Sequence, residues 1–347
     1  MRRDWRRRLG WLLAALVSVC ALAEGLARAV GAPQPYTAIF KFDEVLGYSY
    51  VADQTVEFAV GQGRYRVQFD QEGVIDRSGL RPEAVVILGD GVIAGLELPR
   101  EQRLATLVAA AARTGAVNLA VPGYGLLQEV LGLERWLGAH SAPRVVIVVQ
   151  NFTNDLVDNV PEWEGSAAIP GVRRRNRSEF DVTPPTLPNR AYRWLAGVGK
   201  ASRLYGAYRV SRVSASSAEL PAQQLWLFTT EPPPEIERGL DALRWSGQRL
   251  QALAKRHGFT VVVIDWVDWP LLLRAVDAPL ERQRVASTRV QQAIGFKSHL
   301  LQELAPGRAS GVNWDRQWII EPTRHASAAG ISVVTQAIVD RLRAIYE

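Results

Sequence analysis

The segment VVILGDGVIAG, residues 85–95, provides the first evidence of the fold class. Its first four residues are β-branched or leucine without a polar interruption, which is typical of a strand buried on both faces. The Gly-Asp-Gly that follows predicts a sharp turn into the amphipathic stretch 100–113. In open α/β sheets, ligands bind at the carboxyl ends of such strands. The segment therefore predicts a strand, a tight turn and a helix, which either border a ligand site or form a glycine-rich turn that only packs.

Further strand and helix patterns alternate along the chain. Short apolar strands separated by helical stretches of roughly ten or more residues indicate parallel pairing. We therefore expect an α/β fold with a doubly wound, mostly parallel sheet, of the flavodoxin-like three-layer type. The expected strands are 116–120, 144–150 and 259–265, and the expected helices are 126–137, 234–256, 279–304 and 326–346.

Two segments differ in pattern from this α/β domain, which we assign to residues 84–347. Residues 32–83 are rich in Gly, Tyr, Phe and Val and alternate in polarity, which predicts a small β-rich lead-in. Residues 160–234 lose all periodicity and contain many prolines and an arginine cluster. A long irregular stretch inside a domain often covers a site, so we expect an insertion or cap there.

The first 31 residues are basic and then apolar. Residues 1–8 contain five arginines and one aspartate, and residues 9–23 are apolar apart from one serine. One alternative is a secretory signal that is cleaved near Ala23. The other, which we favour, is a single-pass anchor in the inner (cytoplasmic) membrane, because residues 9–30 can cross a hydrocarbon core of roughly 30 Å. In both cases the arginines stay inside, and the α/β domain lies on the exported, periplasmic or extracellular side.

Charge and cysteine content limit the expected partners. The formal net charge is +6, and four of these charges come from residues 1–8, five arginines minus one aspartate. No basic stripe interleaved with aromatic residues occurs elsewhere, so we expect no nucleic-acid partner. The single cysteine, Cys20, lies in the apolar segment and excludes an intrachain disulfide framework. We assign no metal site and expect no cofactor.

Four short motifs follow the expected strands or precede the last helix: GDG at residues 89–91, Gly123, Asn154 with Asp155, and His325. Their order resembles that of the conserved blocks of the SGNH (GDSL) hydrolases, over about residues 84–347. The resemblance implies an ester-hydrolase fold. It further implies that Gly123 and Asn154 donate hydrogen bonds to an oxyanion, that His325 is the general base, and that Asp90 and Asp155 support the site.

The chain departs from the family pattern at two positions of the catalytic triad. The nucleophilic serine of the G-D-S block corresponds to Gly91, which has no side chain. The acid of the D-x-x-H block corresponds to Pro322, and Glu321 beside it is a candidate substitute. Acyl transfer by a triad needs a nucleophile, a base, an orienting acid and oxyanion donors. The nucleophile position is therefore vacant.

Three functional hypotheses follow from these departures. The first is a pseudoenzyme of the cell envelope that binds an acylated glycan or lipid in the ancestral ester-hydrolase cleft. The second is an active esterase, deacetylase or O-acyltransferase on envelope carbohydrate, with a site rearranged around His325. In that case a water activated by His325, Asp90 or Asp155 supplies the nucleophile. The third is a scaffold without a binding cleft.

Overall fold

The computed structural model describes most of the chain: residues 2–60, 63–79, 82–152, 154–164, 168–176, 179–206, 222–267, 279–301, 319–320 and 325–346. The chain divides into two compact units. The larger unit comprises Lys41–Asp53, Phe69–Leu187 and Ala218–Glu347, and the smaller unit comprises Met1–Phe40, Gln54–Gln68 and Pro188–Ser217.

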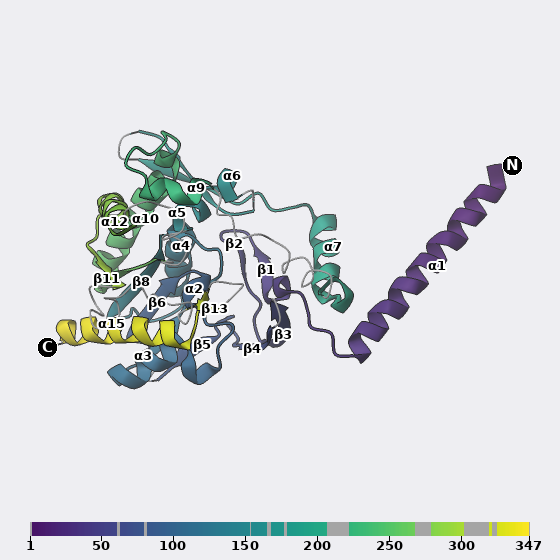
Figure 1. Ribbon diagram of the computed structural model, residues 1–347, viewed down its shortest axis with the longest axis horizontal. Helices are drawn as coiled ribbons and strands as arrows, with labels where there is room; N and C mark the ends of the chain where they lie inside the picture. Colours follow the sequence, from purple (N-terminus) through teal and green to yellow (C-terminus); the bar gives the residue numbers. More distant parts are fainter. Residues whose placement is uncertain are drawn as a thin grey trace. The chain divides into compact units, whose positions relative to one another are not determined.

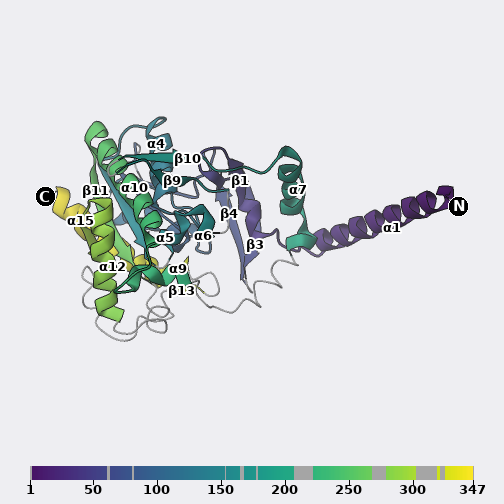
Figure 2. The same cartoon turned by 90° about the horizontal axis from the view of Figure 1, so that it is seen from above.

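The larger unit is built on a six-stranded sheet with the spatial order β12 (Ser298–Leu300), β11 (Thr260–Trp266), β8 (Val145–Asn151), β6 (Val85–Gly89), β7 (Ala116–Asn118) and β5 (Asp76–Ser78). All neighbouring strands pair in parallel except β5, which is antiparallel to β7. Every residue of β6 and β8 is buried, as expected of central strands with continuous apolar sequences. The predicted α/β fold with a mostly parallel sheet is confirmed (Figures 1 and 2).

Helices cover both faces of this sheet: α4 (Leu126–Leu137), α10 (Ile236–His257) and α12 (Pro279–Ile294) on one face, and α3 (Leu104–Ala112) and α15 (Ala328–Tyr346) on the other (Figure 1). Val86 and Leu88 of β6 belong to one hydrophobic cluster with residues of the first group. Because side chains alternate along a strand, Val85 and Ile87 point to the opposite face. Burial on both faces explains the apolar runs without polar interruption.

Two predicted helices differ from the structure by more than two residues at one end. The helix expected over 279–304 ends at Ile294, because Gly295 adopts the left-handed conformation with φ 71° that terminates helices. Strand β12 follows where helix was expected. The helix expected over 100–113 is split into a 3₁₀ turn, η2 (Arg100–Gln102), and α3. Hydrophobic periodicity did not reveal either break, because both depend on a few local backbone angles.

The segment 160–234 contains several short elements: α6 (Pro161–Glu164), β9 (Gly171–Arg174), β10 (Phe180–Thr183), α7 (Arg190–Ala201), α9 (Ala222–Leu225) and η3 (Trp226–Phe228). Most are too short to show a hydrophobic period. The lead-in, residues 32–83, contains β1 (Phe40–Asp43), β2 (Gly47–Tyr50), β3 (Gln54–Val60) and β4 (Gly63–Phe69), and it is divided between the two units.

The smaller unit combines α1 (Arg2–Ala29), η1 (Tyr36–Ile39), the β3–β4 pair and α7. Phe58 is fully buried, with its ring centroid 5.3 Å from that of Tyr36 and 5.8 Å from that of Tyr65. Within α1, the 23 residues Arg7–Ala29 are long and apolar enough to cross a membrane. This helix is compatible with the expected single-pass anchor.

Candidate functional site

The carboxyl end of β6 turns directly into a one-turn helix, α2 (Gly91–Ala94). Asp90 caps this helix, because its Oδ1 accepts a hydrogen bond from the backbone N–H of Val92 at 2.9 Å. Gly95 ends the helix at φ 71°, a conformation that glycine adopts without strain. The turn therefore places Gly91 at the carboxyl edge of the sheet, between the ends of β7 and β8.

His325 lies against Gly91. A Cβ atom built on residue 91 would lie 2.5 Å from His325 Nε2 and 3.2 Å from Pro122 Cβ. The histidine is held by a short antiparallel pair, β14 (His325–Ala326) with β13 (Ile319–Ile320). The residue at the base position thus faces the residue at the nucleophile position, which has no side chain.

The imidazole of His325 is oriented by Glu97. His325 Nδ1 lies 2.8 Å from Glu97 Oε1 and 2.9 Å from Oε2. The Glu97 side chain is only 1% exposed. A carboxylate accepts only, so Nδ1 carries the proton of this hydrogen bond, and Nε2 is the ring atom turned toward Gly91. His325 and Glu97 therefore have the geometry of a base and its orienting acid.

Glu97 is a candidate site residue that the sequence analysis missed. We expected Glu321 to substitute for the acid that Pro322 replaces, and both residues lie outside the described part of the chain. Glu97 stands between two leucines directly after the glycine-rich turn, and both leucines are buried. A carboxylate in such an apolar run needs a partner. That signal was present in the sequence, but it does not identify a partner 228 residues away.

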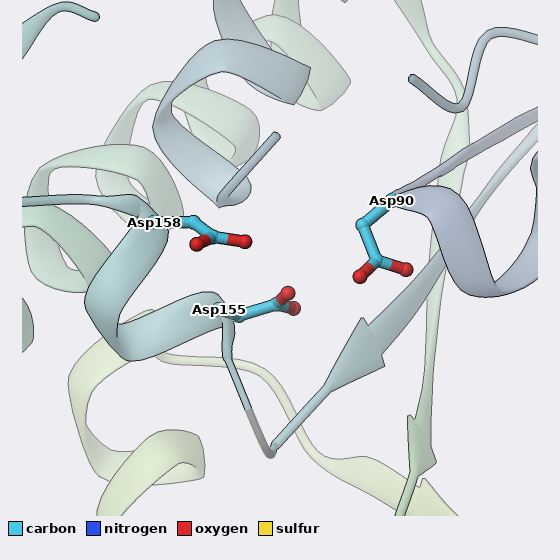
Figure 3. A group of neighbouring side chains, drawn as sticks. All are labelled: Asp90, Asp155 and Asp158. Atoms are coloured by element: carbon cyan, nitrogen blue, oxygen red, sulfur yellow. The ribbon is translucent and has the colours of Figure 1, made fainter. Parts of the chain in front are cut away.

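Three carboxylates converge near the carboxyl end of β6 (Figure 3). Asp90 follows β6, and Asp155 and Asp158 lie on α5 (Asp155–Asp158), which follows β8. Each offers one carboxylate oxygen, and these oxygens all lie within 4.8 Å of one another. All three residues are buried. We call Asp90, Asp155 and Asp158 the carboxylate cluster.

Two asparagine amides bridge the carboxylate cluster. Asn154 Nδ2 donates to Asp158 Oδ2 at 2.7 Å and to Asp90 Oδ2 at 3.2 Å. Asn151 Nδ2 donates to the same Asp90 oxygen at 3.0 Å. Both amide hydrogens of Asn154 are thus directed at carboxylates. Its role as an oxyanion donor stays a prediction, and it requires one of these hydrogen bonds to be exchanged for the ligand.

Burial changes the protonation of two acids at this site. Glu129 of α4 is buried, and burial raises its pKa well above the usual range, with the charges of Asp90 and Asp158 adding to the effect. Burial likewise raises the pKa of Asp155, again reinforced by the neighbouring carboxylates. Within the described part of the chain, neither oxygen of Glu129 has a hydrogen-bond partner. The neutral, protonated forms of Glu129 and Asp155 are therefore favoured.

Among the described residues, the carboxylate cluster is the group whose geometry could accommodate a metal ion. Carboxylate oxygens are the ligands of hard cations such as Ca²⁺ and Mg²⁺. The Nδ2 group of Asn154, however, points at two of these carboxylates. A cation would have to displace this amide or turn it so that Oδ1 faces the ion.

Gly123 lies in the turn after β7. Its φ is 75°, and a Cβ there would lie 2.8 Å from the hydroxyl of Tyr48. That hydroxyl donates to the carbonyl of Pro122 at 2.9 Å and so fixes the turn beside His325. In the described residues we find no hydrogen-bond partner for the N–H of Gly123. The group is therefore suited to the expected oxyanion role, which stays a prediction.

Comparisons with known proteins give only distant structural similarities. No protein-family model and no curated protein matches the chain. Among solved structures, the acetyl xylan esterase Est2A from Butyrivibrio proteoclasticus is 11% identical, with 78% of this chain and 66% of that chain covered and a TM-score of 0.37. The esterase EstA from Pseudoalteromonas sp. is 10% identical, covering 76% and 97%, with a TM-score of 0.36. A lipase/acylhydrolase from Enterococcus faecalis is 12% identical, covering 75% and 95%, with a TM-score of 0.34. Sequence identities and TM-scores this low do not support an argument about function.

Proposed function

We propose that the larger unit is an SGNH-type domain of the cell envelope that binds an acylated carbohydrate or lipid over Gly91 and forms no acyl-enzyme. One observation carries the proposal: the residue beside His325 Nε2 is a glycine. A covalent acyl intermediate needs a nucleophilic side chain next to the base. The order of the four sequence motifs supports the SGNH type, and the N–H of Gly123 is a suitable donor for the ligand's carbonyl oxygen.

The experiment restores the missing oxygen. Wild type and the variants Gly91→Ser and Gly91→Ala are treated as full-length detergent-solubilised proteins with a fluorophosphonate probe. Both variants force the His325 ring to retreat, because a Cβ would lie 2.5 Å from Nε2. Only Gly91→Ser adds a nucleophile, so we expect labelling of Gly91→Ser alone. Strong labelling of the wild type would show serine chemistry elsewhere and refute the proposal.

Binding is tested separately by calorimetry with a partly O-acetylated oligosaccharide. Its chemically deacetylated counterpart is the matched control, since it keeps the sugar and lacks the ester. We expect affinity only for the acetylated form. Equal affinity for both would mean that the acyl group is not recognised.

A second candidate function is direct acyl transfer to water or to an acceptor hydroxyl, and the Glu97–His325 pair favours it. In this reaction His325 Nε2 removes a proton from the attacking oxygen, which forms the new bond to the ester carbon. The ester C–O bond then breaks, and the same proton passes to the leaving alkoxide. No atom of Gly91 takes part.

This reaction predicts slow ester turnover that depends on the pair. We expect His325→Ala to abolish turnover and Glu97→Gln to lower it by about 10- to 100-fold, since an unoriented base loses much of the roughly 10²–10⁴-fold contribution of such catalysis. Glu101→Gln is the matched control, because Glu101 is an exposed glutamate near the same turn. An unchanged rate in His325→Ala would eliminate the second candidate.

The proposal includes a location. The arginines that precede the span Arg7–Ala29 favour a cytoplasmic location for the N-terminus. Helix α1 is then the membrane anchor, and the larger unit is exported. Cleavage near Ala23 remains the alternative, in which the exported protein would be released.

A further inference from the structure

Helix α7 of the smaller unit exposes its apolar face. None of its residues is buried, and Trp194, Leu195 and Val198 are 68%, 58% and 52% exposed. Together with Ala191 they follow the i, i+3, i+4, i+7 spacing of one helix face. On the opposite side, Lys200 Nζ donates to the carbonyl of Phe40 at 2.8 Å. The polarity of this helix is thus the reverse of that of an ordinary surface helix, which buries its apolar face.

The carboxyl end of α7 is bonded to the end of the candidate membrane span. Glu24 of α1 accepts hydrogen bonds from Ser202 Oγ at 2.9 Å, from the N–H of Arg203 at 3.0 Å and from the N–H of Leu204 at 3.1 Å. Arg28 Nη2 donates to the carbonyl of Ala201 at 2.9 Å. Two residues of α1, Glu24 and Arg28, therefore hold the chain that leaves α7.

This attachment determines the level of α7 relative to a bilayer. The span Arg7–Ala29 has 23 residues. At about 1.5 Å per residue it measures about 35 Å, slightly more than the roughly 30 Å hydrocarbon core. Glu24 and Arg28 in its last turns therefore lie near the membrane surface, and residues 201–204 lie there with them.

We propose that α7 is an interfacial helix whose apolar strip, Ala191, Trp194, Leu195 and Val198, inserts into the headgroup region of the phospholipid bilayer that α1 spans. Large apolar side chains of α1, such as Leu22 and Leu26, are exposed as well. Tryptophan and tyrosine favour this region because one end of each ring system is apolar and the other forms hydrogen bonds. Tyr192, also on α7, is 58% exposed. The proposal rests on α1 as a membrane anchor and adds a second membrane contact to it.

The proposal is tested with the full chain in vesicles of phosphatidylethanolamine and phosphatidylglycerol. Cys20 is the single cysteine, so Cys20→Ser allows Val198→Cys to be labelled with the fluorophore NBD. Thr55→Cys is the matched control. It is exposed in the same unit, and it lies at the opposite end of the β3–β4 pair from Arg64, which bonds to Gly31 at the end of α1. NBD on native Cys20 reports whether α1 is inserted.

We expect a blue shift of NBD at position 198 and loss of its fluorescence when the lipids carry a nitroxide near the headgroup, and neither change at position 55. Leu195→Glu should reverse both effects at position 198, whereas Thr55→Glu should leave them intact. If NBD on Cys20 is blue-shifted but position 198 behaves like position 55, the α7 proposal is overturned and the anchor stands. If NBD on Cys20 shows no blue shift either, the anchor and the α7 proposal both fail.

Discussion

The missing side chain at Gly91 allows a close packing that another residue would prevent. Nε2 of His325 lies closer to the Cβ position of residue 91 than an ordinary contact allows. Glu97 holds the other ring nitrogen, so the ring cannot easily turn away. A serine could be accommodated here only if the pair moved back. The glycine, histidine and buried glutamate therefore have the geometry that the proposed general-base site requires, and Gly91 supplies no nucleophile.

Glu129 should make stability depend on pH. Its folded pKa is raised by burial, so the native state keeps a proton that the unfolded chain releases above about 4.5. The free energy of unfolding therefore falls as pH rises from that value toward the folded pKa. We expect Glu129→Gln to be more stable than wild type, by a margin that grows with pH by up to about 1.4 kcal/mol per unit.

Urea unfolding of the detergent-solubilised chain at acidic and at mildly alkaline pH measures this margin. Glu101→Gln, an exposed site, should show the same stability as wild type at both pH values. A constant difference between Glu129→Gln and wild type at all pH values would contradict the raised pKa.

Helix α4 contains a glycine that faces open space. A Cβ on Gly132 would have no atom within 4 Å, because the residue lines a cavity of about 290 Å³ together with Leu46, Val121 and Trp136. In α10, by contrast, a Cβ on Gly247 would lie 2.0 Å from the backbone oxygen of Ile294. This glycine allows α10 and α12 to approach closely. A side chain therefore has room at Gly132 but would clash with the neighbouring helix at Gly247.

This contrast predicts opposite effects of the same substitution. Gly132→Ala should raise the free energy of unfolding by about 0.5–1 kcal/mol, since alanine loses less conformational entropy in a helix. Gly247→Ala should lower it by about 1–3 kcal/mol or more, because overpacking forces the helices apart. Chemical denaturation of both variants measures the two effects. Destabilisation by Gly132→Ala would contradict this expectation, because it would mean that other atoms occupy the space beside residue 132.

The chain as a whole combines a membrane-compatible helix with an α/β unit. If α1 is an anchor, residues 1–23 remain in the mature protein. Intact-mass analysis of membrane-extracted protein should then give the uncleaved chain, and alkaline carbonate should not release it from membranes. Leu13→Arg, which places a charge in the span, should weaken retention because charges inside a bilayer are costly. A mature protein that begins at Glu24 would instead establish cleavage.

The local patterns of the sequence were sufficient to predict the α/β class and most of its strands. Strands β6, β8 and β11 are continuous apolar runs, and such runs indicate burial without any knowledge of their neighbours. The helix expected over 126–137 has the same bounds as α4. The resemblance of the motif order to the SGNH blocks also predicted that Gly91 and His325 lie at one site, and His325 lies against Gly91 in the structure.

The long-range contacts were decided by folding alone. Glu97 and His325 are 228 residues apart, and no spacing rule connects them. The carboxylate cluster and its amide bridges depend on how α5 packs beside β6, and the outward apolar face of α7 depends on which side contacts η1 and α1. Hydrophobic periodicity reports that one face of a helix is apolar, but only the packed chain determines whether that face is covered by protein or left exposed.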